Sequence, residues 1–176
     1  MFHERAAAAA DLALGAVVRP ELHEAVPAPS CRYAVECVGR DGVAKWREEF
    51  GNLVTTGGKD DLLDKYFGAV VSVGWYMGLV NGTPAATDTL ASHAGWSEAT
   101  PYTGNRPAIS WSAASAGSKT ATAVSYAITA GATVTGAFLS SVNTGTAGIL
   151  YSAGNFSASR TVASGDTLNV TPTMSV

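Results

Sequence analysis

The feature that most constrains this fold is an alternation of apolar and polar side chains, running from about residue 70 to residue 176. A period of two is the pattern of β-strands, whose successive side chains point to opposite faces of a sheet. The pattern predicts strands at residues 73–80, 106–112, 120–128, 133–141, 146–152, 161–163 and 168–176. Short strands with closely spaced turns are typical of an antiparallel β-sandwich, of jelly-roll or Ig-like type. We therefore expect a mainly β fold.

Several details extend this prediction. Residues 73–80 are almost continuously apolar, which predicts a strand buried on both faces. Val134 and Phe138 are expected on one face of their strand, and residues 81–99 form a long connection with a helical turn at 88–92. Pro172 has no N–H to donate, so the last strand is expected at a sheet edge or with a bulge. In the strand at residues 120–128, one face is predicted to carry the alternate residues Thr120, Thr122, Val124, Tyr126 and Ile128.

Residues 31–50 carry the strongest local signal, that of a β-hairpin. The apolar residues of its first strand stand at alternate positions, namely Tyr33, Val35 and Cys37. Asp41-Gly42 is a favoured hairpin turn. In the second strand, Trp46 and Phe50 fall on the face opposite the charged side chains Lys45, Arg47 and Glu49.

A link over residues 51–56 leads to one short helix, predicted at residues 57–67 and capped by Thr55 or Thr56. Its apolar stripe would be Leu62, Leu63, Tyr66 and Phe67, with Trp46 packed against Leu62, Leu63 or Phe67. Three acidic residues on this helix, Asp60, Asp61 and Asp64, admit a cation site. Carboxylates on the helix surface, favoured by the helix dipole in its first turns, are the better interpretation.

Residues 1–30 are expected to form an extended N-terminal arm, and residues 31–176 the β-sandwich domain. Residues 6–18 are small and apolar, and Pro20, Pro27 and Pro29 favour extended backbone. Two interpretations remain open, a flexible tail and an arm ordered against a neighbouring subunit. A signal peptide is disfavoured by the thin basic region before the apolar run.

Charge is unevenly distributed along the chain. Residues 1–100 hold 13 acidic and 8 basic side chains, whereas the charged residues beyond them are Arg106, Lys119, Arg160 and Asp166. Faces rich in hydroxyls and poor in charge suit contacts between subunits, although an ordinary sandwich with a Thr-covered exterior explains them equally. The net charge of -3 predicts no nucleic-acid partner, and no apolar run reaches membrane-spanning length.

The cysteines and the candidate reactive groups predict no active site. Cys31 and Cys37 would lie roughly 20 Å apart along one strand, too far for a disulfide with each other. No zinc pattern is present, and two free thiols suit synthesis in a reducing cytoplasm. His93 and Glu98 admit an acid–base pair, but a solvated loop histidine is the better interpretation. The sequence predicts no catalytic, cofactor-binding or metal-binding residue, no cofactor and no enzymatic activity.

Five aromatic residues admit a sugar-stacking platform or, as the favoured interpretation, core packing: Trp75, Tyr76, Trp96, Tyr102 and Trp111. A platform of this kind would make the protein a carbohydrate-binding domain for receptor recognition. Cleavage of a sugar is less credible than binding, because the β half of the chain has almost no acidic residues.

The runs GNLVTTGGKDDLLDKYF, WYMGLV, ASHAGWSEATPYTGNRP, WSAASAGSKTAT and GILYSAGNFSASRTVASGDTLNVT carry a resemblance over residues 33–176. They are similar to small virion structural proteins of tailed bacteriophages. The resemblance implies a β-sandwich in the virion, assembled as a homo-oligomer, a trimer or dimer, on the major capsid protein or other virion proteins. We expect a capsid decoration or cement protein that bridges capsid subunits. A tail, collar or fibre component is the alternative.

Overall fold

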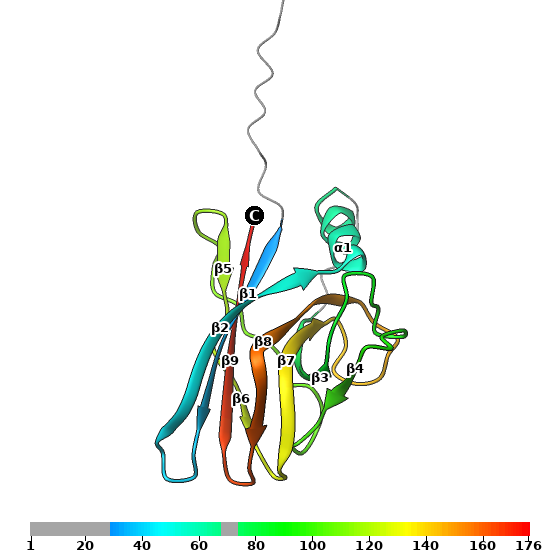
Figure 1. Ribbon diagram of the computed structural model, residues 1–176. Helices are drawn as coiled ribbons and strands as arrows, with labels where there is room; N and C mark the ends of the chain where they lie inside the picture. Colours follow the sequence, from blue (N-terminus) through cyan, green and yellow to red (C-terminus); the bar gives the residue numbers. More distant parts are fainter. Residues whose placement is uncertain (1–28, 68–73) are drawn as a thin grey trace, which may run out of the picture.

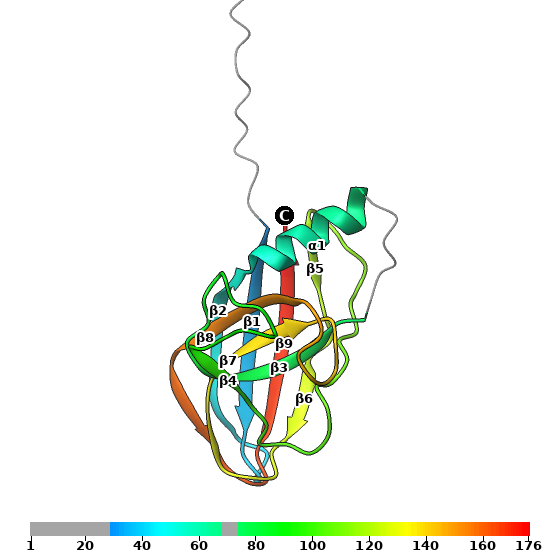
Figure 2. The same ribbon diagram turned by 90° about the vertical axis from the view of Figure 1, so that its right-hand side faces the viewer.

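The computed structural model describes residues 29–67 and 74–176. Its helix is α1 (Thr56–Phe67), and its strands are β1 (Ser30–Val38), β2 (Ala44–Val54), β3 (Tyr76–Gly82), β4 (Trp96–Ala99), β5 (Ser118–Thr120), β6 (Val124–Ala127), β7 (Ala132–Ser140), β8 (Leu150–Val162) and β9 (Thr167–Ser175). The strands pair antiparallel in the order β4-β3-β7-β8-β2-β1-β9-β5, and β6 also pairs with β9. Figure 1 shows β1, β2 and β9 to the left of β7, β3 and β4, and in Figure 2, turned by 90°, β1 and β9 lie behind β7, β3 and β4, so the strands form two facing layers. The predicted β-sandwich is confirmed.

The main core lies between the two layers. The first layer contributes Tyr33, Val35, Cys37, Phe50, Val124, Tyr126, Leu168 and Val170, and the second contributes Met77, Leu79, Val134, Ala137, Leu139, Tyr151 and Phe156. Two buried tyrosines also join the layers by hydrogen bonds. The hydroxyls of Tyr33 and Ser152 lie 2.7 Å apart, and Tyr126 donates to the carbonyl of Met77 at 2.8 Å. Such partners satisfy the polar ends of otherwise apolar side chains.

A second buried cluster covers the outer side of the β3–β7–β8 layer. Its members are Val80, Leu90, Trp96, Phe138, Leu150 and Ala153. Met77 and Leu79 of β3 face the main core, whereas Val80 belongs to the second cluster. The prediction of a strand buried on both faces is therefore confirmed, and the structure places it at Tyr76–Gly82.

The hairpin is confirmed at its turn, but its second strand is longer than predicted. Gly42 has a φ of 79°, a conformation that glycine adopts without strain, and Gly39 accepts a hydrogen bond from its N–H at 2.9 Å. Residues 51–54 belong to β2, so they are not the predicted link. Leu53 and Val54 pair with β8 after the earlier part of β2 has paired with β1, so that β2 joins the two layers.

The helix begins one residue earlier than predicted, and Thr55 is its cap. The Thr55 hydroxyl accepts a hydrogen bond from the N–H of Gly58 at 3.1 Å. Asp60 and Asp61 follow the first turn of α1, which contains no acidic residue. Leu63 is 55% exposed, so the predicted apolar stripe is wrong at that position.

The predicted contact of Trp46 with the helix is also wrong. Trp46 packs edge-on against Phe156, with ring centroids 5.6 Å apart, and the Arg160 guanidinium lies 5.3 Å from its ring centroid. The reason is the length of β2. Val54 lies eight positions beyond Trp46 in the extended strand. Trp46 is therefore roughly 26 Å from the strand end that leads into α1.

Three predictions in residues 81–128 need correction. The connection at 81–99 contains β4, which pairs with β3. Residues 106–112, all described, form isolated bridges at Ala108 and Trp111 in place of a strand. Within 120–128, the irregular backbone between β5 and β6 changes the alternation. Ala121 is buried there and Thr120 and Thr122 are exposed, whereas Val124, Tyr126 and Ile128 face the core as predicted.

Three further corrections concern the last three strands. The predicted strands at 146–152 and 161–163 overlap the two ends of one strand, β8, and residues 146–149 precede it. A register shift between Val134 and Gly136 separates the faces of Val134 and Phe138, which belong to different clusters. Pro172 lies inside the sheet, between β1 and the β5–β6 side. It is tolerated there because it faces the interval between β5 and β6, where its carbonyl accepts from the N–H of Ala121 at 3.0 Å.

The structure locates the C-terminal end of the predicted arm and both thiols. Ser30 already belongs to β1, and residues 1–28 lie outside the described residues. Cys31 and Cys37 are both buried and free, as expected for two inward positions of one strand. Among the described residues, no helix combines the length and apolar sequence that crossing a membrane requires.

Candidate interaction surfaces

His93 and Glu98 are each held by a different neighbour. The His93 ring stacks on Trp96 with centroids 4.1 Å apart, and its Nδ1 lies 3.0 Å from the Trp96 carbonyl oxygen. Glu98 accepts two hydrogen bonds from Arg106, at 2.8 and 2.7 Å. Both side chains thus hold the loops that cover the second buried cluster, and the geometry gives no support to an acid–base pair.

The helix carboxylates do not converge on a cation. Asp61 forms an ion pair with Lys65 at 2.8 Å, one turn along α1. The Lys65 ammonium also lies 4.5 Å from the centroid of the Trp75 ring. Within residues 29–67 and 74–176, no group of three or more His, Cys, Asp or Glu side chains could hold a metal ion.

The few charged residues of the second half are mostly tied to charges of the first half. Asp166 pairs with Lys45, Arg106 with Glu98 and Arg160 with Glu48, each at 2.7 Å. Burial raises the pKa of Glu48, but hydrogen bonds from the Ser157 N–H and from Arg160 outweigh it and lower the pKa overall. Because Arg106, Asp166 and the partner of Arg160 are largely buried, these charges act within the domain.

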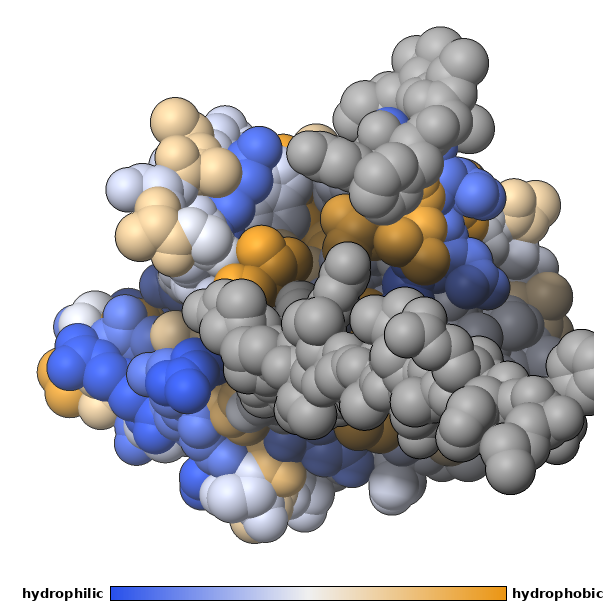
Figure 3. All heavy atoms as spheres, turned by 90° about the horizontal axis from the view of Figure 1, so that it is seen from above, coloured by the Kyte–Doolittle hydropathy of each residue, from blue (hydrophilic) through white to orange (hydrophobic). Residues whose placement is uncertain are grey.

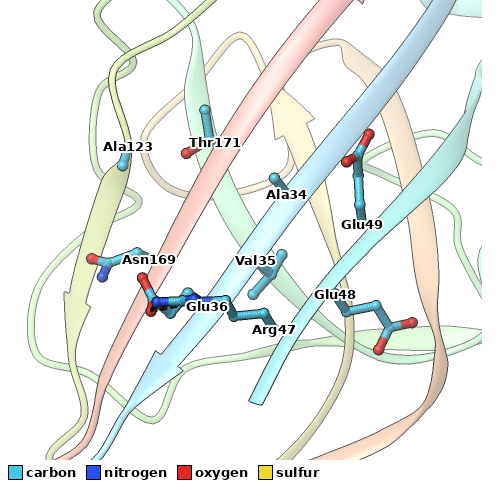
Figure 4. Close-up of a pocket in the computed structure, with 9 residues that line it drawn as sticks. All are labelled: Ala34, Val35, Glu36, Arg47, Glu48, Glu49, Ala123, Asn169 and Thr171. Carbon is cyan, nitrogen blue, oxygen red and sulfur yellow. Dashed lines mark hydrogen bonds and ion pairs between the residues drawn. The ribbon is translucent and has the colours of Figure 1, made fainter. Parts of the chain in front are cut away.

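The first candidate surface is a polar depression on the outer face of the β2–β1–β9 layer. It has a volume of about 620 Å³ and is lined by Ala34, Val35, Glu36, Arg47, Glu48, Glu49, Ala123, Asn169 and Thr171 (Figure 4). Ala34 and Ala123 leave its floor shallow, and Arg47 pairs with Glu36 at 2.6 Å along one side. A shallow face with small side chains and satisfied charges suits contact with a broad protein surface.

The aromatic residues do not form one platform. Trp96 is buried against Phe138, with centroids 5.1 Å apart, and Tyr102 packs on Tyr126 at 4.8 Å. Core packing therefore accounts for these residues. Trp75 and Trp111, which are only half-buried, come together in one groove.

This apolar groove is the second candidate surface, with a volume of about 520 Å³, between α1 and the ends of β5 and β9. Its apolar lining includes Leu62, Trp75, Ile109, Trp111, Leu139, Tyr151, Met174 and Val176, and its charged lining is Asp61, Lys65 and Lys119. Figure 3 looks onto this end of the molecule, where hydrophobic residues gather. No sequence pattern predicts this groove, because its aromatic residues come from segments that only the fold brings together.

Comparison with known proteins identifies the family. The family model described as podophage GP4 fiber I protein gp80 matches residues 54–174, from the end of β2 through nearly all of β9. A search of curated proteins finds no match. The predicted resemblance to small virion proteins of tailed phages is thereby confirmed. The chain belongs to the podophage GP4 fiber I protein gp80 family and is a structural protein of the tailed-phage virion.

Proposed function

We propose that this protein is a fibre subunit of a tailed-phage virion, present in several copies and bound through its β-sandwich to other virion proteins. The observation that carries the proposal is the family match, which covers most of the sandwich and names a fiber protein. It favours the fibre alternative over the capsid cement role expected from the sequence. A non-enzymatic role agrees with a family that is structural.

The two candidate surfaces support contacts with more than one neighbour. The polar depression and the apolar groove lie on different parts of the sandwich, one on the β2–β1–β9 face and the other beside α1. A subunit with two distinct faces can contact its own copies with one and another virion protein with the other. Repeated modest contacts then add up, since each copy raises the effective concentration of the next.

A phage that lacks this protein tests the proposal. If the protein is a fibre subunit, particles without it should assemble and keep their DNA on heating as well as wild-type particles do. They should adsorb poorly to host cells. Adsorption rate and thermal DNA release are measured on the same preparations, and supplying the protein in trans is the control. Normal adsorption combined with DNA loss at lower temperature would contradict the fibre role and favour capsid cement.

A further inference from the structure

The apolar groove has the properties of a site for apolar side chains. Trp75 and Trp111 are half-buried along it, and Leu62, Ile109 and Met174 complete an apolar wall. Its polar groups are few, and Asp61 and Lys65 already pair with each other at 2.8 Å. A sugar needs several hydrogen-bonding partners for its hydroxyls, so this lining suits a protein segment better than a glycan.

The chain that precedes β1 enters the domain at the rim of this groove. Ser30 pairs with Ser175, which also pairs with Ser118, and the last two of these residues line the groove. Val176 donates to the carbonyl of Gly117 at 2.9 Å and completes the rim. In Figure 1 the start of β1, the end of β9 and β5 lie side by side at the top of the molecule. Residues 1–28 are therefore connected to the sandwich beside the groove.

The sequence of residues 6–18, AAAAADLALGAVV, matches the groove in chemistry. It offers small and branched apolar side chains, and such surface is stabilised by removal from water. Asp11 is its one charged residue, and Lys119 stands exposed at the groove rim. An acidic residue in the segment and a basic residue at the rim are complementary.

The prolines between this segment and β1 favour docking on another copy. Pro20, Pro27 and Pro29 favour extended backbone, and ten residues in a polyproline conformation span roughly 30 Å. An extended spacer of that length favours docking on a neighbouring groove over docking on the groove of the same chain. We propose that residues 6–18 of one copy dock in the apolar groove of a neighbouring copy, an inference that rests on the proposed multi-copy assembly.

Photo-crosslinking of the full-length protein tests this docking. A photoreactive amino acid replaces Ala114, an exposed residue of the groove lining, and a second protein carries it at Ser125, an exposed position on β6, as the matched control. The proposal predicts a product of twice the subunit mass, linked to residues 6–18, from position 114 and not from position 125. The double substitution L12D and L14D should abolish that product and increase the dissociation constant of the oligomer at least tenfold.

Three results would overturn the inference: a link between position 114 and residues 6–18 of the same chain, a link to another segment such as residues 68–73, or no link. Leu12 and Leu14 lie outside the described residues, so the variants are expected to keep the fold of the domain, and circular dichroism serves as the folding control. This experiment uses purified protein and reports docking alone. If docking fails while phage lacking the protein still adsorb poorly, the fibre role stands and only the docking inference falls.

Discussion

At the scale of single residues, Asp166 is the one acidic residue in the charge-poor half of the chain, and it forms hydrogen bonds inside the domain. The carboxylate sits at the turn before β9, 96% removed from solvent, and accepts hydrogen bonds from Lys45 at 2.7 Å and from the N–H of Ala163 at 2.9 Å. The hydrogen bond from Lys45 lowers the pKa of Asp166, against the opposing effect of burial. The ionised carboxylate therefore ties the β2 hairpin strand to the β8–β9 turn.

Replacing Asp166 by Asn should destabilise the domain in a pH-dependent way. The folded pKa lies below the ordinary value of 3.8, so the stabilisation is complete above that value and is lost as the pH falls through the folded pKa. We expect a loss of about 1–2 kcal/mol at pH 7 from the missing charged hydrogen bonds. Urea unfolding at pH 7 and pH 3 measures the difference, which should shrink at pH 3.

The matched control is Asp64→Asn, a change at an exposed helix position. It should alter the unfolding free energy by less than about 0.5 kcal/mol at either pH. A deficit for Asp166→Asn that is equal at both pH values would show that the carboxylate charge does not hold the turn.

At the scale of elements, β2 determines the architecture, because it pairs first with β1 and then with β8 and so joins both layers. The sequence indicated its beginning, since the Asp41-Gly42 turn and the alternation on β1 are local signals. Its continuation through Gly51 to Val54 was missed, because glycine and polar residues there resemble a link. The pairing with β8 that keeps this segment extended is a tertiary contact, which no local pattern records.

Other errors have the same physical origin. The strand β8 includes Ser152, Gly154 and Asn155, so it looked interrupted, but β7 pairs along it and satisfies its backbone. Pro172 predicted an edge strand or a bulge. The interval between β5 and β6, which both pair with β9, is sufficient to accommodate it. The apolar groove could not be predicted at all, because Leu62, Trp75 and Trp111 meet only in the folded domain.

The junction between β2 and α1 depends on Thr55. Its buried hydroxyl donates to the carbonyl of Leu150 and accepts from the N–H of Gly58, so it both caps the helix and joins it to β8. Thr55→Ala should lower the free energy of unfolding by about 1–2 kcal/mol, the range for losing a cap. Thr56→Ala, at the exposed next position, is the control and should change it by less than about 0.5 kcal/mol.

Chemical denaturation of the two variants side by side measures this difference. Equal small effects would mean that the backbone hydrogen bond from Thr55 to Tyr151 holds the junction without the hydroxyl.

At the scale of the whole molecule, the sandwich combines a rigid interior with outer faces suited to assembly. Most charged residues of the second half form ion pairs within the domain. The polar depression and the apolar groove are the candidate surfaces for contact with neighbouring proteins. The chain belongs to a fiber family, and a fibre is built from repeated contacts between copies. The two surfaces are therefore candidates for such contacts. The proposed location of the protein is therefore a fibre.

Electron-microscopy reconstruction of wild-type particles and of particles lacking the protein tests this location. The difference between the two maps should be a projecting fibre in which several copies of the sandwich, residues 29–176, fit the density. Difference density lying flat between capsid subunits, with the fibres intact in both maps, would contradict the account.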